Sequence, residues 1–492
     1  MVKKLLELAG EAIYCPKKVG RFYDFVCGDT GVANDNTNTA INNDTAANKH
    51  TDNTAISKDT ATNKHTDSTA TTNANKAANA TIKAIDGGIK ANKTTGKKPT
   101  AKNKALDYYS RRADGGDFVA LFILACFYRI DKDFGNALKY YERLCDSDLG
   151  GITSKHTKCN SRDTTFKHIN GDEIQINAKD LAKIKARSYF YIAVMFLYGY
   201  GVRQDYQKVV ECLEKASDLG YDEAYFALGV MYYIGKGVRQ DYKKAMGYYK
   251  KAADLGNAAA YYALGYMYKN GESVKQDYKK ALQLYKKAAD LGDASACYEL
   301  GKMYYYGENI KQDYKKAAKY FKKAIDLGDD ESYFFLGFMY RFGNGVRQDY
   351  KKAITYLKKV VDLGNAVAGL ANSILADMYY YGEGVRQDYQ KALRHYEKSA
   401  DFGNGDAYCE LGKMYLFGEG VKQDYKKAKA YFEKAAKLGV AVAYFYLGIM
   451  YYIGKGVGQD YKKALRHYEK AASLGDETGR ERYEALSREL GK

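Results

Sequence analysis

The 492-residue sequence has only two prolines, Pro16 and Pro99, and no tryptophan. Proline interrupts helices, so most of the chain is free to form unbroken ones. No stretch approaches the roughly 20 apolar residues that a membrane-spanning helix needs, which excludes a span. Glu7 and Glu11 break the apolar start of the chain, so we expect no signal peptide. The cytoplasm is the expected location, with secretion by a signal-independent route left open.

Catalytic and metal-binding patterns are also missing. The sequence has no S-x-x-K, K-T-G, H-E-x-x-H or phosphate-binding G-x-x-x-x-G-K-[ST] motif. His156, Cys159 and His168 lie close together in a polar insertion, but they lack the spacing of zinc ligands, so we predict a plain loop. His395 and His467 occupy the same position in two copies of a repeat and are interpreted as exposed surface residues. We therefore expect no catalytic residues, no metal, no cofactor and no small-molecule substrate.

Eight cysteines are scattered along the chain, and no C-x-x-C occurs. This usage indicates reduced, mostly buried thiols and a reducing compartment. Cys126 and Cys145 lie on neighbouring predicted helices, so a disulfide between them stays open.

A repeat organises the remainder. The tripeptide Gln-Asp-Tyr occurs eight times, at intervals of 36 residues with one interval of 39, starting at Gln204, Gln240, Gln276, Gln312, Gln348, Gln387, Gln423 and Gln459. A fixed period of this length is typical of a solenoid, in which each unit covers the apolar face of its neighbour.

One repeat, residues 221–256, predicts two helices. The second begins after Asp241, a good N-cap, and its apolar stripe is Tyr242, Ala245, Tyr249, Ala252 and Leu255, ending at Gly256. The first helix stops at the turn Gly235-Lys236-Gly237-Val238, whose glycines allow a sharp reversal. Each repeat is therefore predicted to be a helix–turn–helix.

The pattern A-x-x-x-L-G-x-M-Y-x-x-G-x-G-V-x-Q-D-Y-x-K-A resembles the Sel-one-like repeat family, relatives of the tetratricopeptide repeats. The resemblance covers residues 183–475 and, more loosely, 104–150. It implies an all-α fold, a right-handed α/α superhelical solenoid of about nine to ten helix–turn–helix repeats. It also implies an adaptor or scaffold for other proteins. Some cysteine-rich members staple each repeat with a disulfide, and that regular pairing is missing here.

Composition divides the chain further. Residues 33–100, rich in Asn, Thr, Ala and Lys, have little to bury and are predicted to be a disordered insertion. Residues 1–32 are predicted to supply the first helix of a repeat that this insertion splits. The next segments are divergent repeats (101–150), the polar insertion (151–180), eight regular repeats (181–475) and a C-terminal capping helix (476–492). On that last helix Tyr483, Leu486 and Leu490 share one side.

A helical wheel centred on the glycine of each first helix separates two faces. One carries Ala, Leu, Met and Tyr, and its regular methionines indicate core packing. The opposite face consists of the residue three positions before the glycine and the residues one and four positions after it. This face is unexpectedly aromatic and basic, and it includes Cys409. The predicted protein-binding groove is Phe226, Val230, Tyr233, Tyr262, Tyr266, Lys269, Tyr298, Lys302, Tyr305, Phe334, Phe338, Arg341, Lys413, Leu416, Phe445, Ile449 and Tyr452.

Several alternatives stay open. The aromatic face either binds a protein or only packs against neighbouring turns. The net charge of +18 and the lysine pairs of the second helices allow binding of nucleic acid or anionic lipid, a lesser alternative. A further alternative function is a hydrolase of the β-lactamase kind, an activity attributed to cysteine-rich relatives. We expect a non-enzymatic scaffold that binds a protein or peptide of unknown identity on the concave face of the solenoid.

Overall fold

The computed structural model describes residues 101–146, 164–167, 173–176, 178–364 and 367–491. The predicted split-repeat helix in residues 1–32 and the predicted disordered insertion in 33–100 lie outside them. Within the described residues the chain is all-α apart from one β-hairpin, and it has 20 helices. The predicted fold class, a solenoid of helix pairs, is confirmed.

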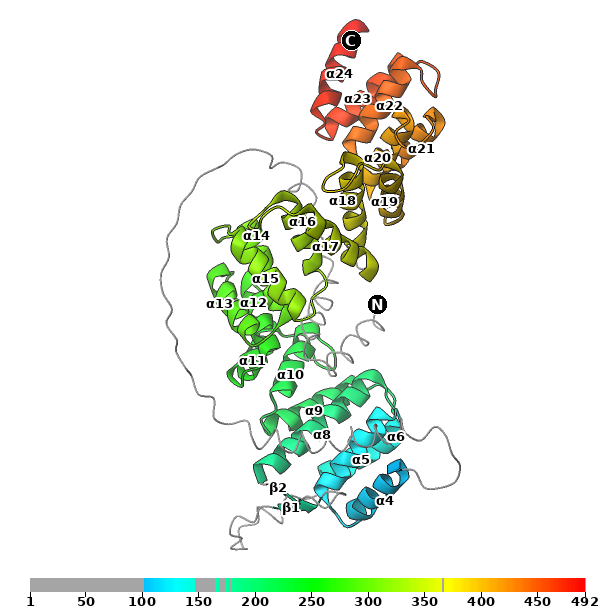
Figure 1. Cartoon of the computed structure of the whole chain (residues 1–492). Coiled ribbons are helices and arrows are strands. Elements are labelled where there is room, and N and C mark those ends of the chain that lie inside the picture. The colour runs from blue at the N-terminus through cyan, green and yellow to red at the C-terminus, as the bar shows by residue number, and fades with distance from the viewer. Residues whose placement is uncertain (1–100, 147–163, 168–172, 177, 365–366, 492) are drawn as a thin grey trace, which may run out of the picture. The chain divides into compact units, whose positions relative to one another are not determined.

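The chain divides into two compact units, residues 1–291 and 292–492. In the first unit the helices are α4 (Ala101–Asp114), α5 (Phe118–Ile130), α6 (Phe134–Asp146), α8 (Ala178–Tyr198), α9 (Tyr206–Asp218), α10 (Asp222–Ile234), α11 (Tyr242–Asp254), α12 (Ala258–Asn270) and α13 (Tyr278–Asp290). Each helix packs against the next one along the chain, so that helix pairs stack in chain order (Figure 1).

The second unit continues the same pattern. Its helices are α14 (Ala294–Tyr306), α15 (Tyr314–Asp326), α16 (Ser332–Phe342), α17 (Tyr350–Leu363), α18 (Ala368–Tyr381), α19 (Tyr389–Asp401), α20 (Gly405–Phe417), α21 (Tyr425–Lys437), α22 (Ala441–Ile453), α23 (Tyr461–Ser473) and α24 (Glu477–Glu489). Even-numbered helices from α8 to α22 are the first helices of the repeats, and the odd-numbered helices that follow them are the second.

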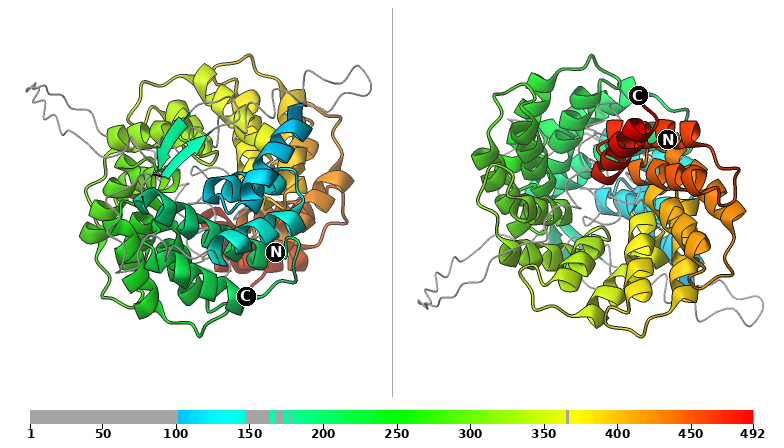
Figure 2. Two further views of the ribbon diagram at one scale, coloured as in Figure 1. Left: turned by 90° about the horizontal axis from the view of Figure 1, so that it is seen from below. Right: turned by 90° about the horizontal axis from the view of Figure 1, so that it is seen from above.

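The polar insertion departs from the predicted loop. Strand β1 (Thr164–Lys167) pairs antiparallel with β2 (Glu173–Ile176), and the two appear as adjacent arrows in Figure 2. Both segments alternate polar residues with β-branched or aromatic ones, a pattern that favours a hairpin. Helix α8 then begins at Ala178, inside the segment that was predicted to be irregular.

The Gln-Asp-Tyr tripeptide joins the two helices of each repeat. In all eight copies the aspartate is the N-cap of the second helix, as Asp241 is for α11. The glutamine amide donates to the carbonyl of the residue seven positions earlier, near the end of the first helix, at 2.6–2.9 Å. The tripeptide therefore satisfies orphan backbone groups at both helix ends that meet at the turn.

The predicted helix ends are largely confirmed. Helix α10 ends at Gly235, which has a left-handed backbone with φ of 70°. Leu255 was placed on the apolar stripe of the second helix, but it is the C-cap of α11 and is 53% exposed. The apolar stripe therefore ends at Ala252, one turn earlier than predicted, because the helix ends before Leu255.

The predicted core face is confirmed. The eight regularly spaced methionines are at most 4% exposed, namely Met195, Met231, Met267, Met303, Met339, Met378, Met414 and Met450. On the capping helix α24, Leu486 is buried and Tyr483 is half-buried, whereas Leu490 is exposed. Cys126 and Cys145 are separate buried thiols and form no disulfide. Burial raises the pKa of Cys145 to about 12, so this thiol stays protonated near neutral pH.

Candidate interaction surface

The structure buries much of the predicted groove. Seven of its residues are at most 8% exposed: Phe226, Val230, Tyr233, Tyr262, Phe334, Arg341 and Leu416. The remaining predicted groove residues are half-buried. The wheel assumed that a first helix is covered on one side only, but a helix inside a solenoid has neighbours on more than one side. Such a helix is apolar around much of its circumference.

Residues three before the central glycine pack within their own repeat. The ring of Phe226 lies 5.7 Å from that of Tyr249, and Tyr262 lies 5.5 Å from Tyr285. Phe445 makes the same contact with Tyr468, at 6.0 Å between ring centroids. These residues of the predicted groove therefore belong to the interior between the first and second helices.

Residues four positions after the central residue of a first helix, which is Gly229 in α10 and Ala376 in α18, connect one repeat to the next. The Tyr233 hydroxyl donates to Glu272 at 2.8 Å, and the Tyr380 hydroxyl donates to Glu419 at 2.5 Å. In both cases the carboxylate lies in the turn of the following repeat, 39 positions along the chain. Tyr233, a residue of the predicted groove, and Tyr380, which was not part of it, thus fix the stacking of adjacent repeats.

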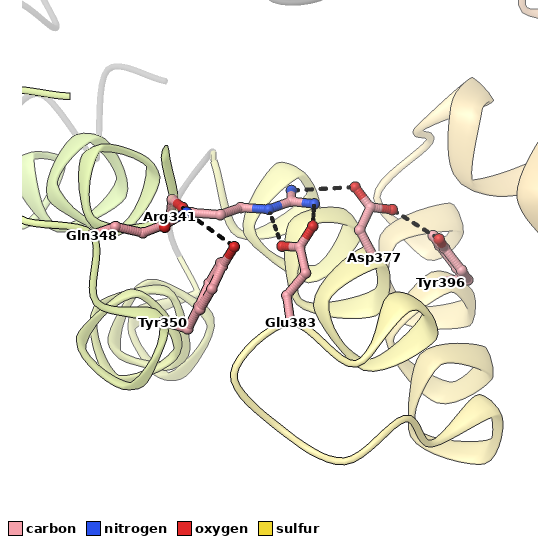
Figure 3. A network of polar contacts seen from close by, with 6 residues as sticks. All are labelled: Arg341, Gln348, Tyr350, Asp377, Glu383 and Tyr396. Carbon is pink, nitrogen blue, oxygen red and sulfur yellow. Dashed lines mark hydrogen bonds and ion pairs between the residues drawn. The ribbon is translucent and has the colours of Figure 1, made fainter. Parts of the chain in front are cut away.

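Arg341 also connects its repeat to the next one, but through ion pairs (Figure 3). The two repeats are the pair whose spacing is 39 residues instead of 36. Its Nε and Nη2 donate to the two carboxylate oxygens of Glu383 at 2.7 and 3.2 Å, and Nη1 reaches Asp377 Oδ2 at 3.4 Å. The other Asp377 oxygen accepts from the Tyr396 hydroxyl at 2.8 Å. A guanidinium suits this place because its planar fork binds a carboxylate bidentately.

The large apolar residues that remain exposed on this side form a row that the wheel missed. They are the last residues of the five first helices in the second unit. We call them the apolar row: Tyr306 (42% exposed), Phe342 (47%), Tyr381 (63%), Phe417 (57%) and Ile453 (44%). The sequence signal is a large apolar residue directly before the glycine that ends each helix, a place where a polar residue would serve equally well.

Half-buried aromatic residues adjoin the apolar row. Tyr306 lies 6.3 Å from Phe335 of the next first helix, and Phe417 lies 6.4 Å from Tyr446. Within α16, the Phe338 ring lies 4.5 Å from Phe342. The exposed residues are thus continuous with a packed aromatic layer, which holds them in position at little entropic cost.

Charged residues interrupt the row at its centre. Lys413 Nζ binds Glu410 Oε1 at 2.5 Å, and both side chains are about a quarter exposed, at 26% and 28%. Burial raises the pKa of Glu410 and that of Asp377, against the opposing effect of the nearby cations. The centre of the row therefore holds carboxylates that are partly removed from water.

The second helices present a different face. In seven repeats the lysine two positions after the Gln-Asp-Tyr tripeptide lies 4.2–5.4 Å from the centre of a tyrosine ring on the first helix of the same repeat, as Lys280 does over Tyr268. These ammonium groups gain a cation–π contact while their charge stays at the surface.

His395 and His467 are half-buried, which corrects the prediction of exposed surface residues. His395 stacks on Tyr379 at 5.5 Å between ring centres, and His467 stacks on Tyr451 at 5.4 Å. In four other repeats the equivalent position holds a tyrosine, as in the stack of Tyr248 on Tyr232. Sequence reasoning missed the stack because the neighbours of the histidines in the chain are charged.

These histidines predict a loss of stability in mild acid. Burial lowers the pKa of His395 from 6.5 to about 4, and it also lowers that of His467. Below pH 6.5 the unfolded chain takes up protons that the folded chain does not, so stability falls as the pH drops towards 4. We expect the double variant His395→Tyr, His467→Tyr to lose about 1 kcal/mol less than the wild type between pH 7 and 5.

Urea unfolding at the two pH values measures this difference. Equal losses in the two proteins would contradict a role for the histidines.

The part of the chain that the structure describes holds no group of three or more His, Cys, Asp or Glu side chains placed to bind a metal ion. Among the same residues, no helix has the length and apolar character that a membrane crossing requires.

The sequence matches the profile of one known repeat family. The family profile of the Sel1 repeat matches nine segments of the chain: residues 119–149, 186–221, 222–257, 258–293, 294–329, 330–365, 369–404, 405–440 and 441–476. No curated protein matches the sequence.

Solved structures that match the chain include three Sel1-type or cysteine-rich proteins. A protective antigen of uropathogenic Escherichia coli that displays an SLR fold is 25% identical, with 78% of this chain and 90% of that chain covered and a TM-score of 0.49. A Sel1 repeat protein from Oxalobacter formigenes is 30% identical, with 61% and 87% covered and a TM-score of 0.47. Helicobacter pylori cysteine rich protein B is 31% identical, with 27% and 92% covered and a TM-score of 0.22.

Proposed function

Because the chain belongs to the Sel1 repeat family, whose members are generally non-catalytic repeat scaffolds, we propose that it is a protein-interaction scaffold. It binds a peptide or protein on the first-helix face of residues 292–492. The observation that carries the proposal is the apolar row, whose five residues are 42–63% exposed at the same position of successive repeats. Large exposed apolar groups of this kind are typical of interaction sites.

The proposed site keeps part of the sequence prediction. The residues one position after the central glycine, among them Lys302, Phe338, Lys413 and Ile449, are half-buried and lie one helical turn before the apolar row. They would line the site, whereas Phe334 and Arg341 are buried and would hold the surrounding helices in place. Tyrosine, phenylalanine and arginine dominate the binding energy of many protein interfaces.

Neither alternative function has an observation in its favour. Seven of the lysines that open the second helices, among them Lys244, Lys280 and Lys316, contact tyrosine rings of their own repeat, which accounts for these seven without nucleic acid or lipid.

A capture experiment tests the proposed function. The double variant Tyr381→Ser, Phe417→Ser removes two exposed rings, and Leu438→Ser is the matched control because Leu438 is 54% exposed at the end of a second helix. From a lysate of the source cells we expect the wild type and the control to capture the same protein, and the double variant to capture at least tenfold less.

Circular dichroism establishes that all three proteins remain equally helical. Equal capture by the double variant and the wild type would overturn the assignment of this face.

A further inference from the structure

The chemistry of the partner can be read from the centre of the apolar row. Tyr381, the most exposed member at 63%, follows Asp377 by one helical turn on α18. The charged groups that act on its hydroxyl are Glu410, Lys413, Asp377 and Arg341. The flanking members, Phe342 and Phe417, are the last residues of the preceding and following first helices. A partner segment crossing these helices therefore meets an apolar group, a charged centre and another apolar group in turn.

The charged centre is short of one cation. Arg341 is bound bidentately by Glu383, and Lys413 is bound by Glu410 at 2.5 Å. These two pairs leave Asp377 as the additional carboxylate. Its contact with Arg341 Nη1 is long, at 3.4 Å, and its side chain is 32% exposed. Three carboxylates thus face two cations in a chain whose net charge is +18.

Asp377 also stands apart from its equivalents. In the other four repeats of the second unit the position after the central residue holds Lys302, Phe338, Lys413 and Ile449, which are basic or apolar. The Tyr396 hydroxyl donates to Asp377 Oδ1 at 2.8 Å and holds this carboxylate in place. Its Oδ2 is the less engaged oxygen.

We propose that the apolar row binds a peptide segment that carries a lysine or arginine between apolar side chains. The cation pairs with Asp377 and lies beside the exposed Tyr381 ring, where a cation–π contact adds to the ion pair. The apolar side chains on either side contact Phe342 and Phe417. This assignment rests on the proposed function, because it names the partner chemistry of the same face.

The electrostatics of the site agree with the assignment. Burial raises the pKa of Asp377 even though Arg341 and Tyr396 lower it. Its charged form is therefore incompletely compensated in the unbound protein, and a cation from a partner would supply the missing compensation. An acidic segment would meet repulsion at the same place, so charge selects between partners.

Selection of random 12-residue peptides displayed on phage, with the immobilised full chain as bait, tests the proposal. We expect the enriched peptides to share a lysine or arginine flanked by Phe, Leu, Ile or Val. The best peptide, synthesised with a fluorescent label, should bind Asp377→Asn at least tenfold more weakly than the wild type in an anisotropy titration. Asparagine keeps the oxygen that accepts from Tyr396, so this variant removes the charge and the long contact with Arg341 Nη1 while that hydrogen bond stays.

The control Leu438→Ser should bind the peptide as the wild type does. Enriched peptides without a basic residue, no enrichment at all, or equal binding by Asp377→Asn would each overturn the proposal. The capture experiment separates this proposal from the proposed function. If the Tyr381→Ser, Phe417→Ser variant fails to capture a protein that the wild type captures, the apolar row remains the interaction surface and only the claim of a basic partner segment is overturned.

Discussion

Replacing Arg341 with methionine is expected to lower the free energy of unfolding by about 3 kcal/mol. The side chain is 8% exposed and holds two carboxylates of the following repeat, Glu383 and Asp377. Methionine fills a similar volume but leaves Glu383 without its bidentate cation, and Asp377 without its one long contact to a cation, in a partly buried junction. The cost of such an uncompensated charge exceeds the value of the pair itself.

The matched control removes an exposed pair from the same unit. Lys429 Nζ binds Glu433 at 2.5 Å along the outer side of α21, with side chains that are 26% and 48% exposed. Lys429→Met should change the free energy of unfolding by no more than about 0.5 kcal/mol. Urea unfolding of the two variants measures the contrast, and equal effects would show that the Arg341 junction carries no special share of the stability.

Changing Gly229 to alanine is expected to destabilise the protein by about 2 kcal/mol, although alanine is the better helix former. A Cβ at this position would lie 2.5 Å from two ring atoms of Tyr249, which is fully buried and cannot move aside. Overpacking therefore outweighs the gain of roughly 1 kcal/mol in helix propensity. The same close approach occurs at Gly301, Gly412 and Gly448, whereas Ala193 and Ala376 occupy the equivalent position in two other repeats.

Gly247 provides the opposite case in the same repeat. It lies in the middle of α11, is exposed, and has nothing within 4 Å of an added Cβ. Gly247→Ala should therefore stabilise the protein by about 0.5–1 kcal/mol through helix propensity alone. Thermal or urea unfolding of both variants gives the signs, and a loss of stability of the same size in both would refute the packing explanation.

Much of the fold follows from the period of the sequence. Glycine at the end of each first helix and aspartate at the start of each second helix mark the turns, and Met231 with its equivalents marks the core. The physical reason is that these positions depend on contacts within one repeat, which the spacing along the chain records. The strand pair at residues 164–167 and 173–176 was missed because each strand has only four residues, too few for its alternation to stand out as a period.

The interaction surface was harder to predict because burial in a solenoid depends on neighbouring repeats. Tyr262 and Phe334 looked like groove residues on an isolated helix, yet they are 1% and 8% exposed. Arg341 looked like a binding anchor, but the turn of the next repeat already binds it. Conversely, the wheel assigned Tyr381 and Phe417 to neither face, and the end of the helix leaves them exposed.

Photocrosslinking from the apolar row is the most direct test of the scaffold assignment. A photoreactive p-benzoylphenylalanine replaces Tyr381 in one protein and Leu438 in a second, and both are irradiated in the source cells. We predict a crosslink to a separate polypeptide from position 381, lost when Phe342 and Phe417 are also changed to serine, and none from position 438. Crosslinking that is absent at 381, or equal at the two positions, would contradict the claim that this face binds a partner.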